Sequence, residues 1–160
     1  MPAAAKPNRM PARIRPTEED GKRSLVEHAA DKAYEARQEY GISLLPGLPL
    51  ESLYALLEDR RFVRYPLRLV FANDPLLEGE FAFIQAVENG NPTSGFILTV
   101  HPAFEGNDAV LPMLVAYHLV CVNYGDIAGP DAAEAFGATL MGMETEDYYQ
   151  QLCQIADSLK

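Results

Sequence analysis

The chain contains 160 residues, of which 48% are hydrophobic and 22% are charged, a balance typical of one folded globular domain and not of a disordered chain. The formal net charge is −10, and residues 65–160 carry thirteen acidic residues against two basic ones, Arg68 and Lys160. Because binding to nucleic acids and to anionic membranes depends on Lys and Arg, this composition argues against both and favours basic protein partners.

The first segment of the chain is basic and rich in proline and alanine. Residues 1–16 contain no acidic residue and no apolar stretch of the kind that a secretory signal requires. Their basic residues are Lys6, Arg9, Arg13 and Arg15. This composition predicts a flexible arm before the folded domain, which we expect to span residues 17–160. An alternative is that this basic arm docks on the acidic body of its own chain or of another.

Two helices are predicted after the basic arm. Two residue pairs have the spacing of a helix capping box, Thr17 with Asp20 and Ser24 with Glu27. Small apolar residues then recur at helical intervals, which predicts a charged amphipathic helix over about residues 17–40. The Gly- and Pro-containing stretch 41–49 interrupts this pattern, and residues 50–59 predict a short second helix.

Three short segments in the middle of the chain have the composition of strands. Residues 67–72, 81–87 and 96–101 are rich in β-branched and aromatic side chains. The turn-forming cluster Asn89–Gly95 separates the last two segments and predicts that they form a hairpin. We therefore expect a small, mostly antiparallel three-stranded sheet.

The remainder of the chain predicts three helices, at about residues 107–124, 131–141 and 145–159. The first contains the longest apolar run, Ala109–Val122, which is shorter than the roughly 20 residues that a membrane span needs. We therefore expect a buried core helix, with Pro112 near its first turn, where a missing N–H costs least. The order of elements predicts an α+β fold with helices packed on one face of the sheet.

Few residues in the sequence are candidates for catalysis. Phosphate-binding loops, nucleophile elbows and Cys-x-x-Cys pairs are absent from it. We expect His28 to be solvated, and His101 and His118 to be neutral and hydrogen-bonded. Cys121 follows His118 by three residues, yet no nearby Lys or Arg would lower the pKa of its thiol, so a catalytic cysteine is not expected. With Cys153 it makes no disulfide framework, which favours reduced thiols and a cytoplasmic location.

One stretch resembles the minimal zincin-type metallopeptidases. Residues 96–125 are similar to the strand, loop and active-site helix of that family, and the resemblance covers about residues 67–142. In the family, an edge strand precedes a helix with two histidines one turn apart that bind zinc, and a glutamate activates the bound water. The resemblance makes His118 the first zinc ligand and Glu134 a third.

The chain departs from the zincin pattern at two positions. Leu119 stands where the general base belongs, and Val122 stands where the second histidine belongs. The resemblance therefore implies a zincin-like fold with an incomplete metal site, no cofactor and no peptidase activity, acting as a binding or scaffold protein. The residues that would have to complete a zinc site are His118, Glu134, His101 and Asp126.

Two other functions stay open. The chain is similar in broad character to secretion chaperones, which hold extended segments of a partner, and it has methionines near its helix ends at positions 113, 141 and 143. This favours an acidic chaperone or adaptor, although helices replace the later strands of that family. The other alternative is a divergent metal-dependent hydrolase. Self-association is a further option, through the basic residues Lys6, Arg9, Arg13, Arg15, Lys22 and Arg23.

Overall fold

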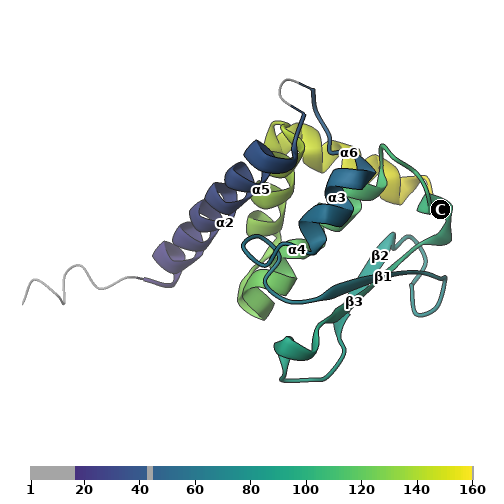
Figure 1. Ribbon diagram of the computed structural model, residues 1–160, viewed down its shortest axis with the longest axis horizontal. Helices are drawn as coiled ribbons and strands as arrows, with labels where there is room; N and C mark the ends of the chain where they lie inside the picture. The colour runs from purple at the N-terminus through teal and green to yellow at the C-terminus, as the bar shows by residue number, and fades with distance from the viewer. Residues whose placement is uncertain (1–16, 43–44, 160) are drawn as a thin grey trace, which may run out of the picture.

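A computed structural model describes residues 17–42 and 45–159 (Figure 1). The basic arm lies outside the described residues, as do the predictions made for its structure. The elements follow the predicted order of helix, short helix, three strands and three helices, and the fold is α+β. Within the described ranges, no helix has the length and apolar character needed to cross a membrane.

Helix α2 (Glu18–Tyr40) begins at the predicted capping box. Asp20 N donates to Thr17 Oγ1 at 3.0 Å, and Thr17 N donates to the Asp20 carboxylate at 3.1 Å. These bonds lower the pKa of Asp20. The second pair with this spacing, Ser24 and Glu27, lies inside the helix, so that part of the prediction marks no helix start. The buried side chains of α2 are alanines, which allow close packing on α5 (Pro130–Met141).

The sheet consists of β1 (Leu67–Phe71), β2 (Ala82–Ala86) and β3 (Phe96–Val100), in the spatial order β1-β3-β2. The predicted hairpin is present, with β2 antiparallel to β3. Strand β1 pairs with β3 in parallel, so the sheet is mixed, and the prediction of a mostly antiparallel sheet was wrong. After β1 the chain crosses to the far edge before β2, and the return strand β3 inserts between them, pointing the same way as β1.

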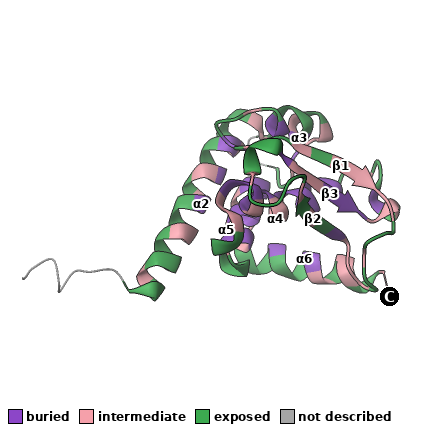
Figure 2. Ribbon diagram, turned by 90° about the horizontal axis from the view of Figure 1, so that it is seen from below, coloured by how far each residue is buried: buried purple, intermediate pink, exposed green. Residues whose placement is uncertain are grey.

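Figure 2 colours the chain by burial and shows buried residues in β3 and in the helices beside the sheet. The strand register assigns the side chains to two faces that differ in burial. One face presents Leu69, Leu98 and Ile84, which belong to or pack against the hydrophobic core. The opposite face presents Val70 and Phe83, which do not belong to that core. Helix α4 (Leu111–Tyr124) contacts β2 and β3 on the buried side. The helices therefore cover one face, as predicted.

Helix α4 is the centre of the core, as predicted from its apolar run. Ten of its fourteen residues are buried, and it packs chiefly on α5. The helix begins at Leu111 rather than near Asn107. Asn107 Oδ1 accepts hydrogen bonds from Ala109 N at 3.2 Å and Val110 N at 3.1 Å, so it caps the turn that leads into the helix. Pro112 lies in the first turn, where its missing donor costs least.

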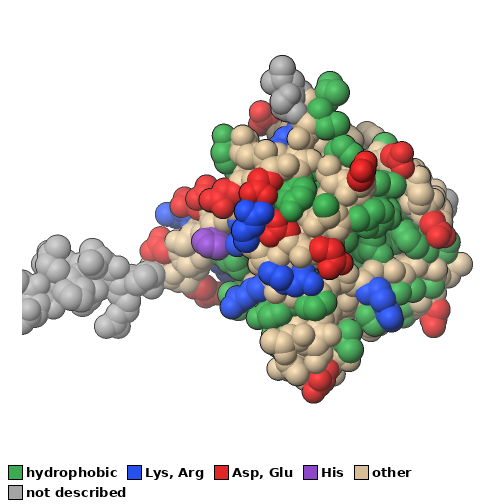
Figure 3. All heavy atoms as spheres, viewed as in Figure 1, with side chains coloured by type: hydrophobic (Ala, Val, Ile, Leu, Met, Phe, Trp, Pro, Cys, Tyr) green, Lys and Arg blue, Asp and Glu red, His purple; other side chains and the backbone are tan. Residues whose placement is uncertain are grey.

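The remaining helices, α3 (Leu50–Leu57) and α6 (Thr145–Asp157), complete the core. In Figure 3, most Lys and Arg side chains on the visible face lie in a belt across its middle. Arg61 belongs to the loop after α3 and donates to both carboxylate oxygens of Glu39, at 2.7 and 2.6 Å, and to Asp59. Arg61 and Tyr40 hold the pKa of Asp59 well below its usual range. This network joins α2 to the loop after α3.

Candidate binding groove

The structure places His118 in a structural role on α4. Its Nδ1 lies 2.9 Å from the carbonyl oxygen of Leu114, and the ring packs edge-on against Phe81 and Tyr117. Burial lowers the pKa of His118 more than the carbonyl bond raises it. The neutral imidazole therefore donates from Nδ1, which is the bonding expected of a buried histidine.

The other histidines and Asp126 belong to other elements of the fold. His101 begins the short 3-10 helix Pro102–Phe104, and its Nδ1 accepts from Ala103 N at 3.1 Å. Asp126 is exposed in the turn that follows α4. His28 on α2 is exposed, as predicted, and its Nδ1 lies 2.6 Å from the Tyr124 hydroxyl.

Glu134 lies on α5, half-buried and near other acidic groups. Burial raises the pKa of Glu134, and Asp131 and Glu146 raise it further. Among residues 17–42 and 45–159, no three His, Cys, Asp or Glu side chains come together in a group that would hold a metal ion. His118, Glu134, His101 and Asp126 therefore form no such group in the described structure, and zinc does not fit this donor set.

Both cysteines are free thiols of intermediate exposure. Burial raises the pKa of Cys121, and the negative charge of Asp126 raises it further. A raised pKa keeps the sulfur protonated at neutral pH, where only the thiolate is nucleophilic. The environment of Cys121 therefore favours a structural thiol, in agreement with the sequence argument.

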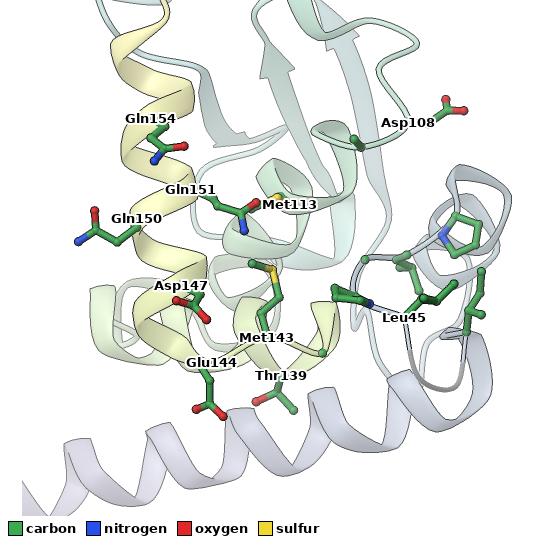
Figure 4. A pocket seen from close by; sticks show the side chains of 17 residues that line it. Leu45, Asp108, Met113, Thr139, Met143, Glu144, Asp147, Gln150, Gln151 and Gln154 are labelled. Carbon is green, nitrogen blue, oxygen red and sulfur yellow. The ribbon is translucent and has the colours of Figure 1, made fainter.

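A groove of about 1260 Å³ lies between α6 and the chain that connects α2 to α3 (Figure 4). Its floor is apolar and includes Leu48, Met113 and Met143. Met113 and Leu48 are buried, whereas Leu45, on the far wall, is 63% exposed. The third methionine noted in the sequence, Met141, is fully buried in the core.

The rim of the groove is acidic and rich in amides. Asp147, Gln151 and Gln154 share one face of α6, because they are spaced at i, i+4 and i+7 (Figure 4). Asp108 and Glu144 add two further carboxylates, and none of the lining residues is Lys or Arg. The groove therefore combines an apolar floor with hydrogen-bonding amides and a negative potential.

Arg37 on α2 holds the wall that faces α6. Its guanidinium donates to the carbonyl oxygens of Gly47 at 3.0 Å and Leu140 at 2.9 Å. The second terminal nitrogen donates to the carbonyl oxygens of Ile42 at 3.2 Å and Leu45 at 2.5 Å. One side chain thus ties the α2–α3 connection to the end of α5.

The end of α5 is shaped around this guanidinium. Gly142 has a φ of +69°, and a Cβ there would overlap the Arg37 guanidinium. The backbone at Gly142 therefore requires glycine for both its conformation and its close approach. Gly47 N also donates to Met141 O at 2.7 Å, which adds a main-chain tie between the same two segments.

The floor is fixed from below by Tyr148. This side chain is fully buried, and its hydroxyl donates to the Met113 carbonyl oxygen at 2.7 Å, joining α6 to α4. Burial raises the pKa of Tyr148 well above its usual value, so the hydroxyl stays protonated and available as a donor. A Cβ at Gly137 would overlap the Tyr148 ring, which explains the glycine within α5.

Sequence reasoning missed this groove because four separate segments line it. The one local signal is the polar face of α6, which carries Asp147, Gln151 and Gln154 beside the buried face of Tyr148 and Leu152. Comparisons with protein-family models, curated proteins and solved structures give no match to this chain. The functional argument therefore rests on the groove and on the residues that position it.

Proposed function

We propose that this protein is a non-catalytic binding module whose groove holds an extended segment of a partner protein. The observation that carries the proposal is an apolar floor bounded by Asp108, Glu144 and Asp147, with no basic side chain in the lining. Apolar side chains of a partner would contact Met113 and Met143, and its cations would pair with the rim. The partner segment is therefore one that mixes apolar and basic residues.

The amides of α6 add a reason to expect an extended segment. Gln151 and Gln154 each offer a donor and an acceptor, which suits the main-chain N–H and C=O groups of a peptide. Of the two alternatives, the groove supports the acidic chaperone or adaptor. A divergent metal-dependent hydrolase has no comparable support, since no group of described residues would hold its metal.

The zincin-like scaffold is part of the proposal. It is supported by the succession of β3, then α4 with His118, then α5 with Glu134. Strand β3 is central rather than the edge strand that the resemblance implies. Leu119 and Val122, where the family has its base and second ligand, are buried in the core. We therefore propose that the scaffold serves binding and not hydrolysis.

The proposal is tested with labelled synthetic peptides and fluorescence anisotropy. A peptide that alternates Leu and Arg should bind the full chain, and one that alternates Leu and Glu should not. The double variant Glu144→Gln/Asp147→Asn should weaken binding about fivefold, since exposed charge pairs contribute about 0.5 kcal/mol each.

The matched control is Glu27→Gln/Asp31→Asn, which makes the same charge change on the exposed surface of α2. It should leave the affinity of the Leu–Arg peptide unchanged. Equal weakening by both double variants would show that the peptide responds only to net charge, and the proposed function would then be wrong.

A further inference from the structure

The basic arm has the composition that the groove requires. Its sixteen residues include four basic residues, no acidic residue, and the apolar side chains of Met1, Met10 and Ile14. The groove offers three carboxylates, no cation and a floor with two methionines. The charge and the apolar character of the two surfaces are complementary. We propose that the groove binds the basic arm of a second copy of this chain, an inference that rests on the proposed function.

The position of the arm argues for a second copy rather than the same one. The arm joins the fold at Thr17, at the start of α2, whereas the groove is lined by Ile42 and Gly142, beside the other end of that helix, where Arg37 approaches Gly142. Twenty residues of helix separate Thr17 from Arg37, a distance of about 30 Å. An extended chain covers at most about 3.3–3.6 Å per residue, so about nine arm residues are needed to span it.

This reach decides which side chains a groove can receive. Within one copy, the backbone of Arg13, Ile14 and Arg15 lies at most about 14 Å from Thr17, so these side chains fall short of the groove even when the arm is fully extended. Lys6, Arg9 and Met10 can reach it. From a second copy, Arg13, Ile14 and Arg15 can enter as well, so the groove can use all four arm cations only between copies.

The stoichiometry follows from the chain itself. Each copy has one basic arm and one groove, so a reciprocal exchange between two copies fills both grooves and closes the assembly. Because the rim charges are exposed, salt weakens the pairing of the arm with the groove. Self-association should therefore depend on both protein concentration and ionic strength.

Sedimentation velocity of the full chain tests this proposal. At low salt the chain should form a dimer that dissociates at high salt. The arm variant Arg9→Glu/Arg13→Glu should be monomeric. Glu144→Gln/Asp147→Asn should raise the dimer dissociation constant about 25-fold, because each of the two grooves loses two charge pairs. The α2 variant Glu27→Gln/Asp31→Asn should dimerise like the unaltered chain. Circular dichroism melting checks that each variant is folded.

Three outcomes would overturn the proposal. A chain that is monomeric at low salt and high concentration excludes exchange between copies. A dimer that survives in the arm variant places the contact elsewhere. A monomer whose arm variant binds the Leu–Arg peptide more tightly than the unaltered chain shows that the arm occupies its own groove.

The same variants separate this inference from the proposed function. The arm variant retains an unaltered groove. If it binds the Leu–Arg peptide while the unaltered chain stays monomeric, the groove is a binding site and only the identity of its occupant is wrong. If the arm variant does not bind the peptide, the proposed function itself fails.

Discussion

At the scale of single residues, His118 combines burial with a hydrogen bond to the Leu114 carbonyl. Because the pKa of His118 is lowered in the folded state, its imidazole takes up a proton at a higher pH in the unfolded chain than in the folded chain. Between the folded pKa and the ordinary value of about 6.5, the unfolded state binds more protons, so His118 stabilises the fold above this range and loses that contribution as the pH falls through it.

The substitution His118→Ala tests this account. At neutral pH it should cost about 1–3 kcal/mol of unfolding free energy, through a cavity and a lost hydrogen bond. The cost should shrink as the pH falls below about 6.5, because the unaltered chain then loses stability by protonation. Urea unfolding at several pH values measures both effects. A cost that stays constant with pH would contradict the argument.

Glu134 supplies the matched control. Its pKa is raised in the folded state, so its effect on stability at falling pH is opposite to that of His118. Its raised pKa means that the folded state binds the proton more tightly, so its contribution increases as the pH falls toward the ordinary value of 4.5. Glu134→Gln should therefore leave the loss of stability below about pH 6.5 in place. If that loss disappears with Glu134→Gln, the assignment of the loss to His118 is wrong, and so is the opposite sign assigned to Glu134.

At the scale of elements, Arg37 is the side chain that holds two segments together. Its guanidinium donates to four carbonyl oxygens, from the α2–α3 connection and from the end of α5. A lysine at this position has a compact ammonium group and cannot reproduce the planar fork. The wall of the groove therefore depends on arginine in particular.

We predict that Arg37→Lys lowers the unfolding free energy by about 1–3 kcal/mol, because the part-buried carbonyl groups of Gly47 and Leu140 lose their donor. It should also weaken binding of the Leu–Arg peptide, although Arg37 does not line the groove. Thermal melting and fluorescence anisotropy measure the two effects. Arg23→Lys, on the same helix, keeps an exposed ion pair with Asp20 and should change neither. A loss of stability without weaker peptide binding would contradict the claim that Arg37 holds the wall of the groove in its binding shape.

The elements themselves were largely predictable from sequence, because their signals are local. Capping at Thr17, the turn at Asn89–Gly95 and the apolar run of α4 each marked an element that the structure contains. Two predictions failed where the same pattern has two structural meanings. Ser24 and Glu27 have capping-box spacing inside a helix, and the helix predicted from about residue 107 begins at Leu111, after a turn that Asn107 caps.

The arrangement of the elements was not predictable in the same way. The insertion of β3 between β1 and β2 is a choice among pairings of segments far apart in the chain, and no local pattern records it. The groove likewise exists only once α6, the α2–α3 connection and the start of α4 meet. The resemblance directed attention to His118 on α4 and Glu134 on α5. The groove is instead lined by the polar face of α6 that carries Asp147, Gln151 and Gln154.

At the scale of the whole molecule, charge is the dominant feature. The net charge is −10, and from Leu69 to Leu159 the chain has no Lys or Arg, so its acidic groups repel one another across the surface. Simple exposed ion pairs that oppose this repulsion, such as Arg23 with Asp20, contribute little.

We therefore expect the melting temperature to rise with added sodium chloride, because screening relieves repulsion that only the folded state concentrates. The measurement is made at a protein concentration where the chain is monomeric, so that dissociation does not contribute. The variant Glu144→Gln/Asp147→Asn, which removes two negative charges, should show a smaller rise. A melting temperature that falls with salt would mean that the exposed ion pairs stabilise the fold more than the acidic surface destabilises it.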